Sequence, residues 1–316
     1  MDETNKISLL AKSICDCPEV GRALKDVSHP CNKVVAVQNV IASVDPELRQ
    51  RPEPWIGNIG DCKLLFLSSN PGISDDPVIE HREDFPTYRL SPDESADFFV
   101  NRFNQKNVPI HATFRHPTEP DFLVRCFDGE YRSGMKKEKQ SQSTWKGIHA
   151  MAVDVLGNQC DPNKDYALTE IVHCKSKMAE GVSEASEMCV NNWLPRILGA
   201  SSARVIVIVG SKVRDNFAIP QLNFREDFGS DKQKVYKSLS KQERAIRDIQ
   251  ISNFGGFNRL YFYTFHPTHA ISPNRLQDMY GEEVVLWIQR ITSGRDSLPT
   301  SDSSLKELLI QLTSKP

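Results

Sequence analysis

The sequence predicts an α/β protein with a three-layer α/β/α arrangement around a central, mostly parallel sheet of four strands. Three observations support this prediction. Four short apolar segments rich in β-branched and aromatic residues cover residues 63–68, 166–173, 204–209 and 259–265. Helical patterns lie between them, over residues 143–155 and 183–194. Strands that alternate with helices along a chain are typical of parallel sheets whose two faces are covered by helices.

Composition and charge exclude several classes of protein. The chain has 316 residues, and its 39 basic and 41 acidic residues give a formal net charge of −2, so any site for a polyanion must be local. The apolar run over residues 205–209 is too short to cross a bilayer. The first four residues are acidic and lack the pattern of a secretion signal, and eight cysteines in this length fit a reducing compartment. We therefore expect a soluble, cytoplasmic monomer with no membrane partner.

The organisation of the chain is expected to be one large domain with two smaller additions. We predict an N-terminal helical extension, the α/β domain, and a C-terminal tail that ends in a short helix; they cover residues 1–54, 55–291 and 292–316. Two polar segments without clear periodicity interrupt the domain at about residues 73–142 and 220–258. Insertions of such length are usually functional lids or partly disordered.

The residues that follow each predicted strand are the first candidates for a site, because ligands of parallel sheets lie outside the carboxyl ends of the strands. Residues 67–74, which contain Asn70-Pro71-Gly72, resemble the first motif of the mismatch-specific branch of the uracil-DNA glycosylase superfamily. Residues 266–270, which begin His266-Pro267, are similar to the second motif, which opens a loop that enters the minor groove. Residues 168–174 resemble a Thr-Asn-Val-Val-Lys-Cys segment of the iron–sulfur branch. Three motifs in the right order at strand ends carry this resemblance.

The resemblance implies a monofunctional DNA glycosylase that uses base flipping and base excision, with Asn70 and His266 as catalytic residues. Breaking an N-glycosidic bond develops positive charge on the sugar and negative charge on the departing base. Asn70 is the position that holds the attacking water, and His266 the position that donates to the base O2. Phe85 is a candidate stacking platform, and Ser69 and Thr268 are candidate base contacts. A turn residue at Asn70 and a structural histidine at His266 are the competing interpretations.

The pattern is broken at Glu170, where uracil-reading members have an asparagine that pairs with uracil. An ionised glutamate only accepts hydrogen bonds, so it can accept from the exocyclic amine of cytosine but cannot donate to uracil O4. A protonated Glu170 would donate to cytosine N3 and help a poor leaving group depart. A helix cap or a salt-bridged carboxylate is the competing role for this residue.

The substrate that we favour is a modified cytosine, as in phage DNA, because excision of ordinary cytosine would destroy the host genome. Bacterial antiviral members of the superfamily excise such bases, which implies a role in antiviral defence. The alternatives are a uracil or mismatch repair glycosylase and a non-catalytic module that binds nucleic acid on the same scaffold. The partner in each case is DNA, double-stranded or single-stranded.

Two segments supply candidates for DNA binding. They are Ile271, Arg275 and His269 in the loop after the second motif, and Lys136, Lys137 and Lys146 in a basic stretch. Ile271 would fill the gap left by a flipped nucleotide, and Arg275 would meet a phosphate. The basic stretch, residues 132–146, holds five basic residues against one acidic residue. Packing of Ile271 under its loop and a solvated, flexible basic loop are the competing interpretations.

The cysteines are the candidates for a metal site. Cys174 and Cys189 stand at the spacing of the later two ligands of the iron–sulfur branch, and Cys15 and Cys17 lie where its N-terminal pair is expected. That branch has two residues between its first pair, whereas this chain has one, and Cys31 is a possible substitute. The prediction is a structural [4Fe-4S] cluster that the chemistry does not need, with buried free thiols as the alternative.

Overall fold

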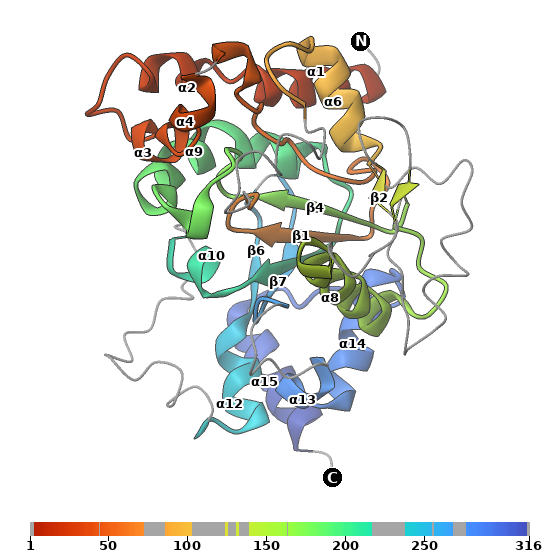
Figure 1. The fold of residues 1–316 in the computed structure, drawn as a ribbon. Coiled ribbons are helices and arrows are strands. Elements are labelled where there is room, and N and C mark those ends of the chain that lie inside the picture. The colour runs from red at the N-terminus through yellow and green to blue at the C-terminus, as the bar shows by residue number, and fades with distance from the viewer. Residues whose placement is uncertain are drawn as a thin grey trace.

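A five-stranded sheet forms the centre of the computed structural model (Figure 1). The structure describes residues 3–43, 45–72, 86–102, 124–125, 131–132, 139–162, 164–216, 238–254, 256–267 and 276–314. The strand order is β4-β1-β5-β7-β6. Their bounds are Leu64–Ser68 for β1, Tyr166–Glu170 for β4, Val205–Val209 for β5, Ile249–Ser252 for β6 and Arg259–Thr264 for β7. A separate two-stranded pair joins β2 (Val124–Arg125) and β3 (Tyr131–Arg132).

The prediction of an α/β fold with a mostly parallel sheet is confirmed. The four expected strands are β1, β4, β5 and β7, and all of them pair in parallel. Every residue in these four strands is buried, which explains why they read as continuous apolar runs.

The expectation of four strands was wrong by one. The fifth strand, β6, is antiparallel to β7 at the edge of the sheet, within the segment expected to be a polar insertion. Its two central residues, Gln250 and Ile251, are only half-buried, so the strand lacks the strong apolar signal of the others. Helix α12 (Lys241–Asp248) precedes it and begins with a capping box between Ser240 and Glu243.

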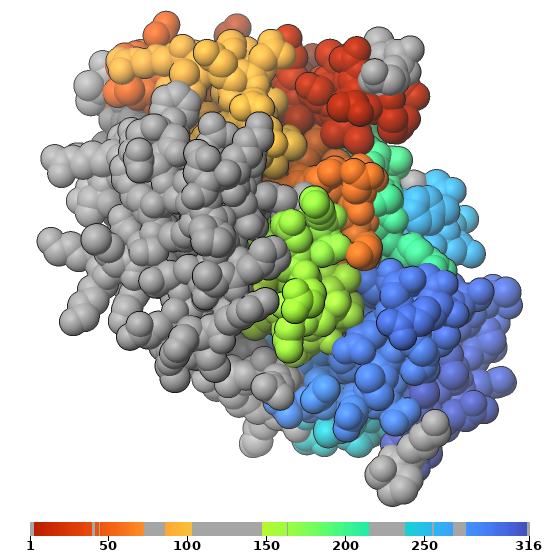
Figure 2. All heavy atoms as spheres, turned by 90° about the vertical axis from the view of Figure 1, so that its right-hand side faces the viewer, coloured from red at the N-terminus to blue at the C-terminus, as the bar shows by residue number. Residues whose placement is uncertain are grey.

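Helices lie on both sides of the sheet (Figure 1). On one side are α1 (Glu3–Cys15), α2 (Pro18–Ala23), α3 (Asn32–Ala36), α4 (Asn39–Ala42), α6 (Pro92–Val100) and α9 (Val182–Ala200). On the other side are α8 (Lys139–Leu156), α12, α13 (Leu276–Tyr280), α14 (Glu282–Thr292) and α15 (Asp302–Thr313). Figure 2 shows the same order on another face, with the N-terminal region and α6 above the C-terminal helices. No helix among the described residues is long and apolar enough to span a membrane.

Several helices begin earlier than the sequence suggested. Helix α8 begins at Lys139 instead of residue 143, and the short helix that we expected at the end of the tail, over residues 305–312, is α15 and begins at Asp302. The N-cap of α15 is Ser301, whose side chain accepts from the amide of Ser304, so the helix includes the polar residues before its apolar stripe. Helix α6 lies inside the first predicted insertion, where Ser91 and Glu94 form a capping box. The short elements η1 (Pro46–Leu48), η2 (Lys177–Ala179) and α10 (Ser211–Asn216) complete the described structure.

An extended segment from the N-terminal region covers the outer edge of β4. Ile56 and Leu168 exchange backbone hydrogen bonds of 2.8 and 2.9 Å. Further along, the amide of Glu53 donates to the carbonyl of His173 at 2.9 Å, and Nδ1 of His173 lies 2.7 Å from the carbonyl oxygen of Glu53. This pairing satisfies backbone groups that an exposed edge strand would leave open, and it brings Glu53 beside the end of β4.

A fully buried arginine joins the end of α9 to the strands on the far side of the sheet. Arg259, at the start of β7, donates to the carbonyls of Ala203 and Ser201 at 2.9 Å and of Phe254 at 3.2 Å, and also to Leu198. The carbonyls at a helix end have no partner within the helix, so this guanidinium replaces water for them in the interior.

We expect Arg259→Met to lower the free energy of unfolding by about 3 kcal/mol or more, because several buried carbonyls lose their donor together. Urea denaturation followed by circular dichroism measures this loss. Arg295→Met, at an exposed arginine, is the matched control and should change the free energy of unfolding by less than about 0.5 kcal/mol. An equal effect of the two substitutions would show that Arg259 does not hold the end of α9.

Candidate functional site

The turn after β1 fixes the orientation of the Asn70 side chain. The hydroxyl of Ser69 donates to Oδ1 of Asn70 at 3.1 Å. Nδ2 of Asn70 donates to the carbonyl of Pro71 at 2.7 Å and lies 3.4 Å from the carbonyl of Ser176. The amide is therefore held with its nitrogen toward the protein backbone, and Oδ1 keeps capacity for a second donor such as water.

The chain after β4 runs alongside the turn that carries Asn70. Ser68 and Glu170 are paired in register at the ends of β1 and β4. The amides of Ile171 and Val172 donate to the carbonyls of Ser68 and Ser69 at 2.9 and 3.0 Å. The amide of Ser176 donates to the carbonyl of Pro71 at 3.0 Å. The two strand ends therefore continue side by side, and Asn70 and Glu170 share one edge of the sheet.

Glu170 belongs to a group of four ionisable residues. Glu170, Glu53 and Lys175 are buried, with 7%, 4% and 3% of their surface exposed, and Arg102 beside them is half-buried. Nζ of Lys175 lies 3.5 Å from one carboxylate oxygen of Glu53, and Nη1 of Arg102 lies 3.9 Å from the other. Among the described residues, the carboxyl group of Glu170 forms no hydrogen bond or ion pair. Both cations therefore pair with Glu53, and the carboxyl group of Glu170 can form hydrogen bonds with a ligand.

The surroundings of Glu170 favour the protonated form of its carboxyl group. Burial is the main cause that raises its pKa well above the usual value, and the negative charge of Glu53 raises it further. Arg102 and Lys175 act in the opposite direction but do not overcome burial. A protonated carboxyl group has one donor and one acceptor, so Glu170 can both give and receive a hydrogen bond at this site.

His266 and Pro267 follow β7 at the same edge, and two glycines allow their position. A Cβ atom on Gly210, at the end of β5, would lie 3.3 Å from Cβ of His266. A Cβ atom on Gly147, in α8, would lie 2.1 Å from Cβ of Pro267, which no side chain tolerates. Glycine at residue 147 therefore permits α8 to approach the backbone that carries His266.

Several predicted site residues lie outside the described residues. They are Phe85, Thr268, His269, Ile271, Arg275, Lys136 and Lys137. Lys146 belongs to α8, but the position of its side chain is likewise outside the description. Their predicted roles in base and DNA binding stay predictions.

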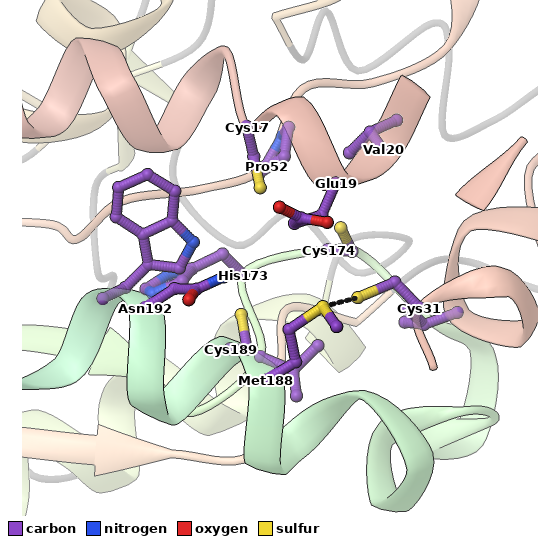
Figure 3. A pocket seen from close by; sticks show the side chains of 13 residues that line it. Cys17, Glu19, Val20, Cys31, Pro52, His173, Cys174, Met188, Cys189 and Asn192 are labelled. Carbon is purple, nitrogen blue, oxygen red and sulfur yellow. Dashed lines mark hydrogen bonds between the residues drawn. The ribbon is translucent and has the colours of Figure 1, made fainter. Parts of the chain in front are cut away.

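Four cysteines line one apolar hollow between the N-terminal helices and α9 (Figure 3). They are Cys17 before α2, Cys31 before α3, Cys174 after β4 and Cys189 in α9. Met188, Trp193 and Val172 are among the other lining residues, and Sγ of Cys31 lies 3.8 Å from Sδ of Met188. The carboxylate of Glu19 also points toward the hollow.

The electrostatics of the thiols agree with this grouping. Burial raises the pKa of Cys31 to about 11 and also raises the pKa values of Cys17, Cys174 and Cys189. The pKa of Cys174 is raised further by the other three thiols. Without a bound cation all four therefore stay protonated at neutral pH.

Cys15 is not a member of this group. It is buried at the end of α1, and it does not line the hollow. Burial raises its pKa to about 12, and the charges that act on it are Arg51, Glu53 and Asp16 instead of the other cysteines. Cys31, the substitute that the sequence offered, lines the hollow because the chain returns to it after α2, whereas Cys15 is buried at the end of α1.

Within the described residues, no three histidine, cysteine, aspartate or glutamate side chains are placed so that they could hold one metal ion.

Sequence reasoning missed the charged residues that surround Glu170. Glu53 stands between Pro52 and Pro54 in a segment without periodicity, and Arg102 lies at the end of the helix α6 that was not expected. Lys175 follows Cys174 directly, and its burial could not be inferred because lysine is almost always exposed.

Comparison with known proteins adds no assignment, because no protein-family model and no curated protein matches this chain.

We expect the free energy of unfolding of Glu170→Gln to increase relative to that of the natural protein as the pH rises. The folded state retains the proton of Glu170 above the usual pKa of 4.5, whereas the unfolded state loses it, so the natural protein loses stability as pH rises. The difference should increase by up to about 1.4 kcal/mol per pH unit until the folded pKa is passed.

Denaturation midpoints between about pH 5 and pH 8 measure this effect. Glu180→Gln, at an exposed glutamate a few residues along the chain, is the control and should show little pH-dependent difference. A constant difference for Glu170→Gln across the range would mean that Glu170 is ionised in the folded protein.

Proposed function

We propose that this protein is a monofunctional DNA glycosylase with the three-layer fold of the uracil-DNA glycosylase superfamily. It flips a modified pyrimidine out of DNA and hydrolyses the N-glycosidic bond, which leaves an abasic site. The observation that carries the proposal is that Asn70, Glu170 and His266 lie at the carboxyl ends of β1, β4 and β7, at one edge of the sheet. A protein that only binds nucleic acid has no need for an oriented amide, a neutral carboxyl group and an imidazole at one edge.

Asn70 positions the attacking water. Ser69 and two backbone carbonyls orient its amide, so Oδ1 accepts a hydrogen bond from water that attacks the anomeric carbon of the sugar. The electron pair of the breaking bond leaves with the base. His266 donates to the O2 oxygen of that base as negative charge develops there. An asparagine is a poor general base, so most of the rate comes from departure of the base and not from activation of water.

Glu170 reads the Watson–Crick edge of the flipped base. Its protonated carboxyl group has a donor for N3 of cytosine and an acceptor for the exocyclic amine. The same protonated group can donate to O4 of uracil and accept from its N3–H, so hydrogen bonding alone does not distinguish the two bases. Proton transfer does, because cytosine accepts the proton at N3 and becomes a better leaving group, whereas uracil carries a hydrogen there already. Modified cytosine, as in phage DNA, therefore remains the favoured substrate, with uracil or mismatch repair as the alternative.

The four cysteines of the hollow are proposed to hold a structural [4Fe-4S] cluster. Four cysteines are the usual ligand set of such clusters, and Cys17, Cys31, Cys174 and Cys189 surround one apolar hollow. A bound cluster would cross-link α2 and α3 to α9 and to the segment after β4. Cys174 lies four residues beyond Glu170, so this cross-link would stabilise the base-reading edge without taking part in the reaction.

The direct test of the function is base release from DNA. The protein is incubated with uracil-containing DNA, ordinary bacterial DNA and phage DNAs that carry modified cytosines. Released bases are identified by mass spectrometry, and abasic sites by alkali-induced strand cleavage. Release of a modified cytosine supports the proposal, release of uracil alone selects the repair alternative, and binding without any release selects the non-catalytic module.

Asn70→Ala should lower the rate of base release by at least about a hundredfold, while DNA affinity changes little, because the residue orients water and does not grip the backbone. Single-turnover release and a gel-shift titration measure the two effects. Ser69→Ala should have a smaller effect of the same kind, since it removes one of the contacts that orient Asn70. Asn101→Ala, at the end of α6, is the control. Normal turnover by Asn70→Ala would remove the water-positioning role.

Cys31→Ser should abolish iron binding, whereas Cys15→Ser should retain it, because only Cys31 lines the hollow. Protein purified without oxygen is assayed for iron, for zinc and for absorption near about 400 nm, where iron–sulfur proteins absorb. Iron loss in both variants would return Cys15 to the ligand set. A natural protein that is colourless, iron-free and fully active would remove the cluster.

A further inference from the structure

A highly exposed methionine stands at the sheet edge that carries the proposed site. Met178 lies in η2, in the loop between β4 and α9, and 87% of its surface is exposed. Its backbone is left-handed, with φ 49° and ψ 27°, and Ala179 follows with φ 59°. Residues with a Cβ atom rarely adopt this conformation, and two in succession occur only where the surroundings impose it.

The contacts that impose this conformation come from both neighbouring strand ends. Nζ of Lys212, in α10 after β5, donates to the carbonyl of Met178 at 3.0 Å. The hydroxyl of Ser176 donates to the carbonyl of Glu180 at 2.6 Å and closes the loop. The backbone amide of Ser176 donates a hydrogen bond to the carbonyl of Pro71, next to Asn70. The loop is therefore fastened to the turn after β1 and to the helix after β5, and it holds Met178 outward in solvent.

The surroundings of Met178 fit a nucleic acid better than a protein partner. Lys177 and Lys212 are both exposed beside it, although the whole chain has a net charge of −2. The core of a protein interface is depleted of charged residues, whereas among the described residues the exposed side chain of Met178 is flanked by two cations. The positive charge of the two lysines attracts phosphates also while Nζ of Lys212 donates to the carbonyl of Met178, and an apolar side chain can replace the stacking partner of a base where the duplex is distorted.

We propose that Met178 packs against an unstacked base beside the flipped nucleotide, with Lys177 and Lys212 near the adjacent phosphates. This inference rests on the proposed action on DNA. It adds a contact after β4 to the wedge predicted at Ile271 after β7, so the DNA would be held from two sides of the edge that carries Asn70 and Glu170.

The test compares Met178→Ala with Val27→Ala, an 89% exposed apolar residue between α2 and α3. The dissociation constant is measured for a duplex with one stable abasic-site analogue and for a single strand of the same sequence. Met178→Ala should weaken duplex binding by about tenfold, the effect of losing one stacking contact, and single-strand binding by less. Val27→Ala should bind both DNAs as the natural protein does.

Two outcomes overturn the inference. One is duplex binding by Met178→Ala equal to that of the natural protein, with an unchanged denaturation midpoint. The other is a shift from dimer to monomer in Met178→Ala without DNA, because Met178 would then join two copies of the chain.

Base release by the natural protein tests the proposed function independently of this binding measurement. If no base is released but Met178→Ala still weakens duplex binding, the result supports the Met178 contact and contradicts the glycosylase activity. If base release occurs and Met178→Ala binds DNA as the natural protein does, the result supports the glycosylase activity and contradicts the contact.

Discussion

The parallel pairing of β1 with β4 is the constraint on which the candidate site depends. It places Ser68 opposite Glu170, and the backbone bonds continue past both strand ends as far as Pro71 and Ser176. Two loops that are about one hundred residues apart in the sequence are thereby held at hydrogen-bond distance. The orientation of Asn70, the exposure of Met178 and the burial of Glu170 all follow from this continuation.

Burial of charge is the second determinant of the site. The segment that covers the edge of β4 delivers Glu53, and Glu53 takes the two nearby cations, Arg102 and Lys175. Charges inside a protein are costly unless they are paired, and the two cations pair with Glu53. Burial first, and the charge of Glu53 second, raise the pKa of Glu170, so a residue from the N-terminal region contributes to the electrostatics at the end of β4.

The N-terminal region therefore contributes to the site in two ways. It supplies Glu53 through its extended segment, and it supplies Cys17 and Cys31 to the hollow that also contains Cys174 and Cys189. Cys174 and Lys175 are neighbours in the chain, so the hollow and the buried charges meet on one short segment after β4. A substitution among the cysteines of the hollow should therefore alter the position of the buried charged residues, and the reverse, through this segment.

The sequence by itself determined the parallel sheet, because buried parallel strands are continuous apolar runs and the helices between them have a different period. It also placed Asn70, Glu170 and His266 at strand ends, since in such a sheet all carboxyl ends share one edge. Tertiary structure decided what depends on contacts between distant segments. β6 became a strand only through pairing with β7. Cys31 lines the hollow and Cys15 does not, because the chain turns back after α2. The pKa of Glu170 is raised by burial and by the negative charge of Glu53. The burial of a side chain cannot be inferred from residue type or spacing. Burial shifts the pKa of a carboxyl group, and the tertiary structure decides which side chains lie next to a thiol.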